Sequence, residues 1–153
     1  LQLANYVATL AGGGTRYNAH LLKEVRTYDS AELVDVYDEP PAEIVDIEPE
    51  NLQAVLQGMR DLVVSGSVAY YFKDCVVDAA AKTGTVQTGD TKNNNGAFVC
   101  FAPYDDPQIA VAIVIEKGGS GAALASTAVQ VLNAYFSNTS ASSAITGENT
   151  LLG

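Results

Sequence analysis

Histidine and cysteine are scarce in this 153-residue chain, which has one histidine, two cysteines and no tryptophan. A structural zinc site needs about four nitrogen or sulfur ligands, so no metal site is expected, and nothing in the sequence indicates a cofactor. His20 is the only histidine that a serine–histidine–aspartate triad could use, and no residue spacing in the sequence supports such a triad. His20 is therefore expected to be structural or exposed. Cys75 and Cys100 cannot build a disulfide scaffold, since small secreted folds use at least about four cysteines.

Basic side chains are also few, with 8 lysines and arginines against 18 acidic residues and a formal net charge of −10. This balance argues against nucleic acid or an anionic membrane as a partner. No apolar run reaches the roughly 18 residues that a bilayer-spanning helix needs. The composition, 48% hydrophobic and 17% charged, is that of a globular chain, and its length suits one domain with a core.

The acidic residues are concentrated in one segment. Residues 24–50 hold ten of them against Arg26 alone, a net charge of −9, whereas the rest of the chain carries a net charge of −1. We expect a solvated excursion of loop and short strands, because like charges ordinarily stay in water. A cation site or a partner surface is the alternative.

Hydrophobic periodicity predicts three helices. Apolar residues recur at helical spacing over residues 1–11 and again from Pro49 to about Ser65, where a proline in the first turn is tolerated. A third helix follows the glycines at positions 118, 119 and 121. Residues 137–153 are rich in Ser, Thr, Asn and Gly and predict a flexible polar tail.

Three strands are expected at residues 77–86, 97–102 and 109–116, and a turn-rich loop from Thr88 to Gly96 that includes Asn95-Gly96 joins the first two. Both faces of the third strand are apolar, so helices should cover both. The sequence thus predicts an α+β fold with three antiparallel strands and helices on both faces. A hairpin centred on residues 91 and 92 would place Cys100 opposite roughly Thr83 and leave Cys75 too distant for a disulfide, so two free thiols are expected.

One tetrapeptide, Lys82-Thr83-Gly84-Thr85, interrupts a strand otherwise made of valine and alanine. A lysine and two hydroxyls in an apolar strand are costly unless they have partners. A glycine lets a ligand come close, and an exposed edge with these side chains could pair with an extended peptide and bind its carboxylate. The alternative is a lysine that protects an edge strand from aggregation.

Beyond the tetrapeptide, several segments and their order along the chain resemble those of a known protein family. The segments are LQLANYVATLAGGG, NLQAVLQGMRDLVVSGSV, AAKTGTVQTG and NGAFVCFAPYDDPQIAVAIVIEKGG. The chain resembles the C-terminal half of the transpeptidase domain of class B penicillin-binding proteins, which belong to the serine D,D-transpeptidase and β-lactamase-like superfamily. The resemblance covers residues 1–136. One departure is Ser65-Gly66-Ser67, where the family more often has a Gly-Thr-Ala-like turn.

The resemblance implies a serine acyltransferase that cross-links peptidoglycan stem peptides and is inhibited by β-lactams. It implies that Lys82 holds positive potential at the substrate carboxylate and that the hydroxyls of Thr83 and Thr85 bind that carboxylate. The Thr85 N–H would be one oxyanion donor, and Gly84 would leave room for the ligand. The longer protein would be extracytoplasmic and anchored in the bacterial cell membrane, whereas this piece would be soluble.

The reactive centre of that family is absent from the chain. None of its serines has a lysine three residues on, and no Ser-x-Asn occurs. We therefore predict an incomplete β-lactamase/transpeptidase-like fold that is inactive alone and pairs with the missing N-terminal half of the domain, or with a second copy as a homodimer. Two other functions stay open: a non-catalytic module that binds peptides or partners, and part of a β-lactamase or β-lactam sensor domain.

Overall fold

The computed structural model describes residues 1–88 and 94–144. Its centre is an antiparallel sheet of order β5-β6-β7, with β5 at Ala80–Val86, β6 at Asn95–Ala102 and β7 at Ile109–Ile115. Lys82 pairs with Val99 across β5 and β6. Alternate side chains of β6 point to opposite faces, so each face of the central strand needs its own apolar cover.

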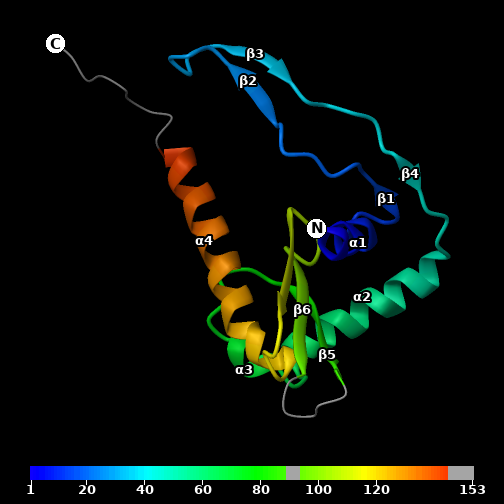
Figure 1. Cartoon of the computed structure of the whole chain (residues 1–153). Helices are drawn as coiled ribbons and strands as arrows, with labels where there is room; N and C mark the ends of the chain where they lie inside the picture. Colours follow the sequence, from blue (N-terminus) through cyan, green and yellow to red (C-terminus); the bar gives the residue numbers. More distant parts are fainter. Residues whose placement is uncertain (89–93, 145–153) are drawn as a thin grey trace.

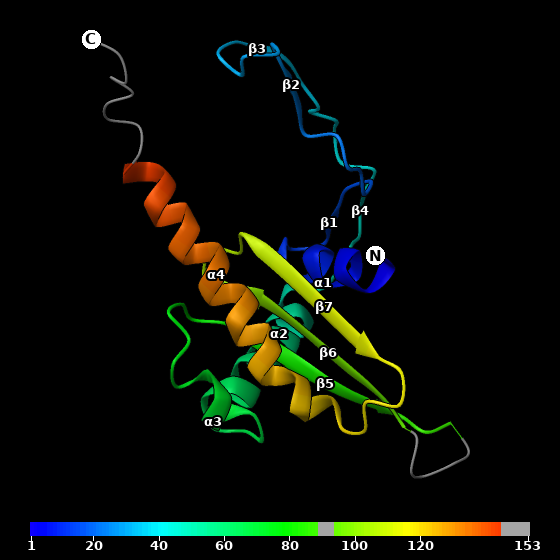
Figure 2. The same ribbon diagram turned by 60° about the vertical axis from the view of Figure 1, so that its left-hand side comes forward.

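Helices supply that cover on both faces (Figure 2). On one face, α1 (Gln2–Ala11) and α2 (Pro49–Val64) pack with the sheet around a buried cluster. That cluster consists of Val7, Met59, Ala80, Val99 and Phe101. On the other face, the 3-10 helix η1 (Gly121–Leu124), α4 (Ala125–Ala144) and α3 (Ala69–Phe72) surround Phe98 and Cys100. The predicted α+β class, with three antiparallel strands between helices, is confirmed.

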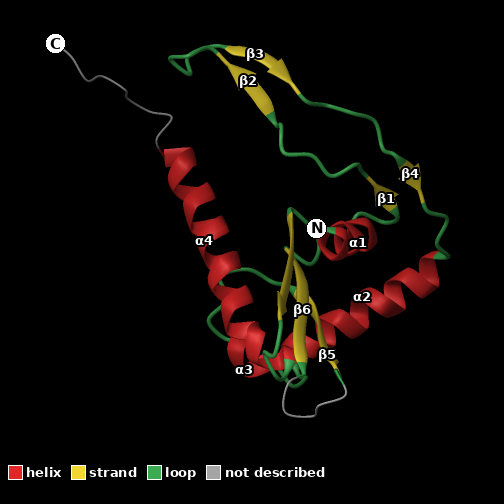
Figure 3. Ribbon diagram, in the orientation of Figure 1, coloured by secondary structure: helices red, strands yellow, loops and turns green. Residues whose placement is uncertain are grey.

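An arm of two short ladders leaves the body between α1 and α2 (Figures 1 and 3). In it, β1 (Thr15–Arg16) pairs with β4 (Glu43–Ile44), and β2 (Glu24–Arg26) pairs with β3 (Leu33–Val36). Most of its residues are exposed, and two arginines there form surface ion pairs, with Glu43 and Glu24. The acidic segment is thus the solvated excursion that its charge predicts. Within the described residues, no cluster of His, Cys, Asp and Glu could hold a metal ion.

Two predicted strand boundaries are wrong. The first strand begins at Ala80, which pairs with Phe101, rather than at residue 77. Beyond this pair Pro103 has no N–H to donate to a ladder, and the Asp78 carbonyl oxygen accepts instead from the Tyr104 N–H at 2.9 Å. Asn95 and Gly96, expected in a turn, are the first residues of β6. Residues 89–93 of the expected loop lie outside the described residues.

The cysteines are both free, with Cys100 buried in β6 and Cys75 half-buried before β5. Cys100 faces Ala81 rather than Thr83, so the pairing lies two residues from the predicted one.

The C-terminal helix is longer than expected, since α4 runs to Ala144 and residues 137–144 are helical where a flexible tail was predicted. Ser, Thr and Asn each cost only a few tenths of a kcal/mol in a helix, and elongation of a helix already packed on the sheet is far cheaper than nucleation. Residues 145–153 lie outside the described residues. None of the described helices combines the length and hydropathy needed to cross a bilayer.

Candidate functional site

The Lys82-Thr83-Gly84-Thr85 tetrapeptide lies in β5, at one edge of the sheet. In the described part of the chain β5 pairs with β6 alone, so its other side is open. Thr83 and Gly84 are half-buried, whereas Lys82 and Thr85 are exposed. The four residues are therefore consecutive on an accessible sheet edge.

The two threonines and Lys82 use different faces of β5. Thr83 and Thr85 alternate with Lys82 and so lie on the face of the sheet that η1 and α4 cover. The Thr85 Oγ1 accepts a hydrogen bond from the Gly121 N–H at 3.3 Å. The Lys82 Nζ donates to the Thr83 carbonyl oxygen at 2.7 Å, which holds the ammonium against its own strand. The Thr85 hydroxyl and the Lys82 ammonium are thus each held by a hydrogen bond to backbone at or near this strand.

Arg60, on α2, anchors the chain at the start of β5. Its guanidinium bonds the Asp78 carboxylate at 2.7 Å and the Ala79 carbonyl oxygen at 2.9 Å. The same group lies over the Tyr104 ring, 5.5 Å from its centroid. These contacts fix the position at which β5 enters the sheet, two residues before Lys82. Arg60 does not stand out in the sequence, because nothing in its local pattern indicates a contact with residues 78 and 79.

The chemistry available at this edge is anion binding. A lysine ammonium, two hydroxyls and backbone N–H groups form charge-assisted hydrogen bonds with a carboxylate. The tetrapeptide brings no nucleophile with an adjacent base, and the chain has no Ser-x-x-Lys. Cys100 is no substitute, because burial raises the pKa of its thiol to about 12.

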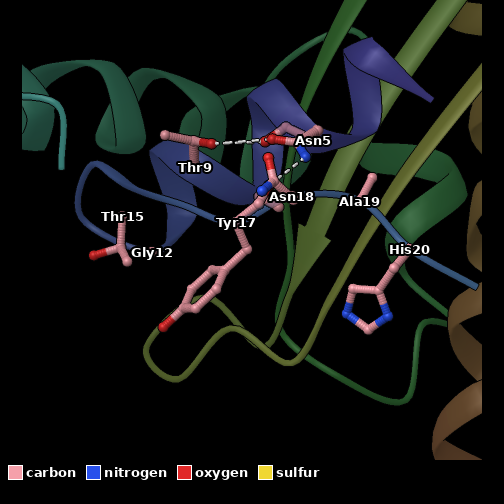
Figure 4. A pocket seen from close by; sticks show the side chains of 9 residues that line it. Asn5, Thr9, Gly12, Thr15, Tyr17, Asn18, Ala19 and His20 are labelled. Atoms are coloured by element: carbon pink, nitrogen blue, oxygen red, sulfur yellow. Dashed lines mark hydrogen bonds between the residues drawn. The ribbon is translucent and has the colours of Figure 1, made fainter. Parts of the chain in front are cut away.

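A separate hollow of about 450 Å³ lies between α1 and the following segment (Figure 4). Two of its polar side chains are already paired: the Asn5 amide donates to the Tyr17 carbonyl oxygen, and the Thr9 hydroxyl donates to the Asn5 carbonyl oxygen. His20 is exposed, with Nδ1 2.6 Å from the Leu22 carbonyl oxygen and its ring 4.0 Å from that of Tyr37. His20 is therefore an exposed residue with local contacts, and the hollow brings no acid–base pair.

The sequence matches a known family along most of its length. The family described as penicillin-binding protein transpeptidase domain covers residues 1–136. Penicillin-binding protein 2A of Bacillus subtilis is 34% identical over 128 residues, which are 75% of this chain and 18% of that protein. Peptidoglycan D,D-transpeptidase PbpA of Mycolicibacterium smegmatis is 30% identical over 124 residues, 78% of this chain and 24% of that protein. The chain thus spans roughly a fifth of the length of these relatives.

Solved structures show the same relationship in the fold. Penicillin-binding protein 2B from Streptococcus pneumoniae superposes with a TM-score of 0.71 at 26% identity, over 88% of this chain and 24% of that one. PBP2 of Pseudomonas aeruginosa gives a TM-score of 0.71 at 31% identity, over 88% of this chain and 29% of that one. The family match, the identities and the shared fold agree: the chain belongs to the transpeptidase domain family of the class B penicillin-binding proteins.

Proposed function

We propose that this chain forms the carboxylate-binding wall of the acyl-transfer site in a longer, membrane-anchored, extracytoplasmic penicillin-binding protein that cross-links peptidoglycan. The observation that carries the proposal is the open-edged β5, with an ammonium and two hydroxyls on four consecutive residues, in a chain of the transpeptidase family. A relative named peptidoglycan D,D-transpeptidase supports the same reaction.

In this reaction a serine outside the chain attacks a carbonyl of a D-Ala-D-Ala stem peptide, and an amine resolves the acyl-enzyme. Lys82 supplies positive potential at the substrate carboxylate. The hydroxyls of Thr83 and Thr85 donate hydrogen bonds to that carboxylate. A β-lactam with its own carboxylate is bound by the same three groups.

The backbone of β5 fits the remaining roles. Along an antiparallel edge strand, alternate residues direct their N–H and C=O groups away from the neighbouring strand. The Thr83 carbonyl accepts from the exposed Lys82 ammonium, and Thr85, two residues on, has its N–H on the same side. That N–H is our candidate oxyanion donor. A Cβ at Gly84 would only touch Ala97 at 3.4 Å, so packing within the chain does not demand glycine there, and we assign its small size to the ligand.

The nucleophile and the Ser-x-Asn motif must come from other parts of the longer protein, because the chain contains neither Ser-x-x-Lys nor Ser-x-Asn. The principal partner of this chain is therefore the remainder of its own domain. By itself the chain should bind a stem peptide or a β-lactam only without acylation, and its intact mass should stay unchanged after incubation with benzylpenicillin.

The test is acylation of the longer protein by a fluorescent penicillin. Lys82→Ala should lower the second-order rate constant of labelling about 10- to 100-fold, the loss of one charge-assisted interaction of about 1.5–3 kcal/mol. Lys23→Ala, which removes an exposed lysine within the arm, is the matched control and should label at the parent rate. Absence of labelling in the parent protein, or parent-rate labelling of Lys82→Ala, would overturn the proposal.

A further inference from the structure

The turn that begins η1 packs against β5 and β6 without room for any side chain. A Cβ at Gly121 would lie 2.2 Å from the Gly84 carbonyl oxygen and 2.3 Å from the Ala97 carbonyl oxygen. Both clashes are with backbone atoms, which cannot rotate away. Gly96 lies in the same contact, since its own added Cβ would be 3.5 Å from the Ser120 carbonyl oxygen. The turn therefore rests directly on the backbone of the β5–β6 ladder at Gly84.

This close approach brings the Gly121 N–H to the Thr85 hydroxyl. The N–H donates to Thr85 Oγ1 at 3.3 Å, across 36 residues of sequence. The turn is held in place by Ser120, whose hydroxyl accepts from the Ala122 N–H at 3.3 Å. A hydroxyl has one proton to donate and two lone pairs that accept. Because Gly121 occupies a lone pair and not the proton, the Thr85 hydroxyl can still donate.

We propose that Gly121 is a positioning residue that orients the Thr85 hydroxyl as a donor to the substrate carboxylate, an inference that rests on the proposed function above. Gly121 acts in two ways: it lets η1 touch the ladder, and its N–H occupies an acceptor site of Thr85. Gly121 itself touches no substrate. In the sequence this glycine indicates only the approach to the last helix, since its contact with Thr85 is visible only in three dimensions.

The experiment measures acylation of the longer protein by benzylpenicillin and by its methyl ester. Gly121→Ala should slow acylation by the free acid about tenfold, but slow acylation by the ester, which has no carboxylate charge to bind, less than about threefold. Gly58→Ala, at an exposed helical glycine whose Cβ meets nothing within 4 Å, is the matched control and should react at parent rates with both.

The same Gly121→Ala change in a Thr85→Val protein separates a positioning role from a general loss of structure. If Gly121 acts through Thr85, the free-acid penalty of Gly121→Ala should disappear in a Thr85→Val protein, which has no hydroxyl to orient. Equal slowing of acid and ester, or an undiminished penalty in the Thr85→Val background, would show a merely structural role. A parent protein that no penicillin acylates would instead refute the proposed function itself.

Hydrogen exchange keeps the inference testable if Gly121→Ala does not fold. In the longer protein, the peptide that spans residues 118–124 should exchange faster in Thr85→Val than in the parent, because the Gly121 N–H loses its acceptor. Thr85→Ser keeps the hydroxyl and should retain parent-like exchange. Identical exchange in all three proteins would contradict the hydrogen bond on which the inference depends.

Discussion

Cys100 shows how one buried side chain can make stability depend on pH. It lies in the central strand with no solvent exposure, and burial raises the pKa of its thiol from 9.0 to about 12. Between these values the folded protein keeps the proton that the unfolded chain has lost. The stabilisation is therefore complete below pH 9 and is lost as the pH rises toward 12, by up to about 4 kcal/mol.

Urea denaturation at about pH 8 and pH 10.5 should detect this loss as a fall of about 2 kcal/mol in the free energy of unfolding, half of the full effect. Cys100→Ala is the comparison, since it keeps every other ionisable side chain of the protein. It should be less stable at pH 8, because it leaves a cavity, but should lose less stability on going to pH 10.5. Equal losses in the two proteins would show that Cys100 is not the group responsible.

At the scale of elements, Asn133 joins α4 to the segment between α3 and β5. Its side-chain carbonyl accepts from the Val76 N–H at 2.9 Å, and its amide donates to the Asp74 carbonyl oxygen at 3.0 Å. Asn133→Leu leaves both backbone groups without this partner. We expect a loss of about 1–3 kcal/mol in the free energy of unfolding, measured by urea denaturation. Gln130→Leu, at an exposed position of the same helix, should change stability by less than about 0.5 kcal/mol.

Some elements could be predicted from the sequence, whereas the start of β5 could not. The helices over residues 1–11 and 49–65 and the strand over 109–116 follow from periodicity, and the structure has them within one or two residues. Where β5 begins was predicted wrongly, because the answer depends on the register with β6 and on Pro103 just beyond it, which lie far away along the chain. Periodicity within one segment carries no information on such contacts.

The candidate site likewise has residues that could be predicted from the sequence and one that could not. Lys82 to Thr85 stand out in the sequence because their polarity conflicts with an apolar strand, and β5 does place them at an open edge. The contribution of Gly121 could not be inferred, since a glycine before a helix is ordinarily explained by the turn it makes. Only the register of β5 and β6 brings Gly121 against Gly84.

At the scale of the whole molecule, the two edges of the sheet differ in chemistry. The β5 edge carries Lys82, whereas β7, from Ile109 to Ile115, has no charged residue and in the described part of the chain pairs with β6 alone. An apolar edge of this length is a template for strand addition. The net charge of −10 opposes association only weakly there, because most of the excess lies in residues 24–50, and the arm projects away from the sheet (Figures 1 and 2).

We therefore expect the isolated chain to self-associate through β7, with sedimentation velocity showing larger species as the concentration rises. Val114→Lys places a charge on this edge at a side chain that is 61% exposed, and should shift the distribution toward monomer. Val55→Lys makes the same chemical change on the surface of α2, where the valine is 48% exposed, and should leave the distribution unchanged. A monomer at every concentration would disprove association, and equal shifts in both variants would attribute it to net charge rather than to the β7 edge.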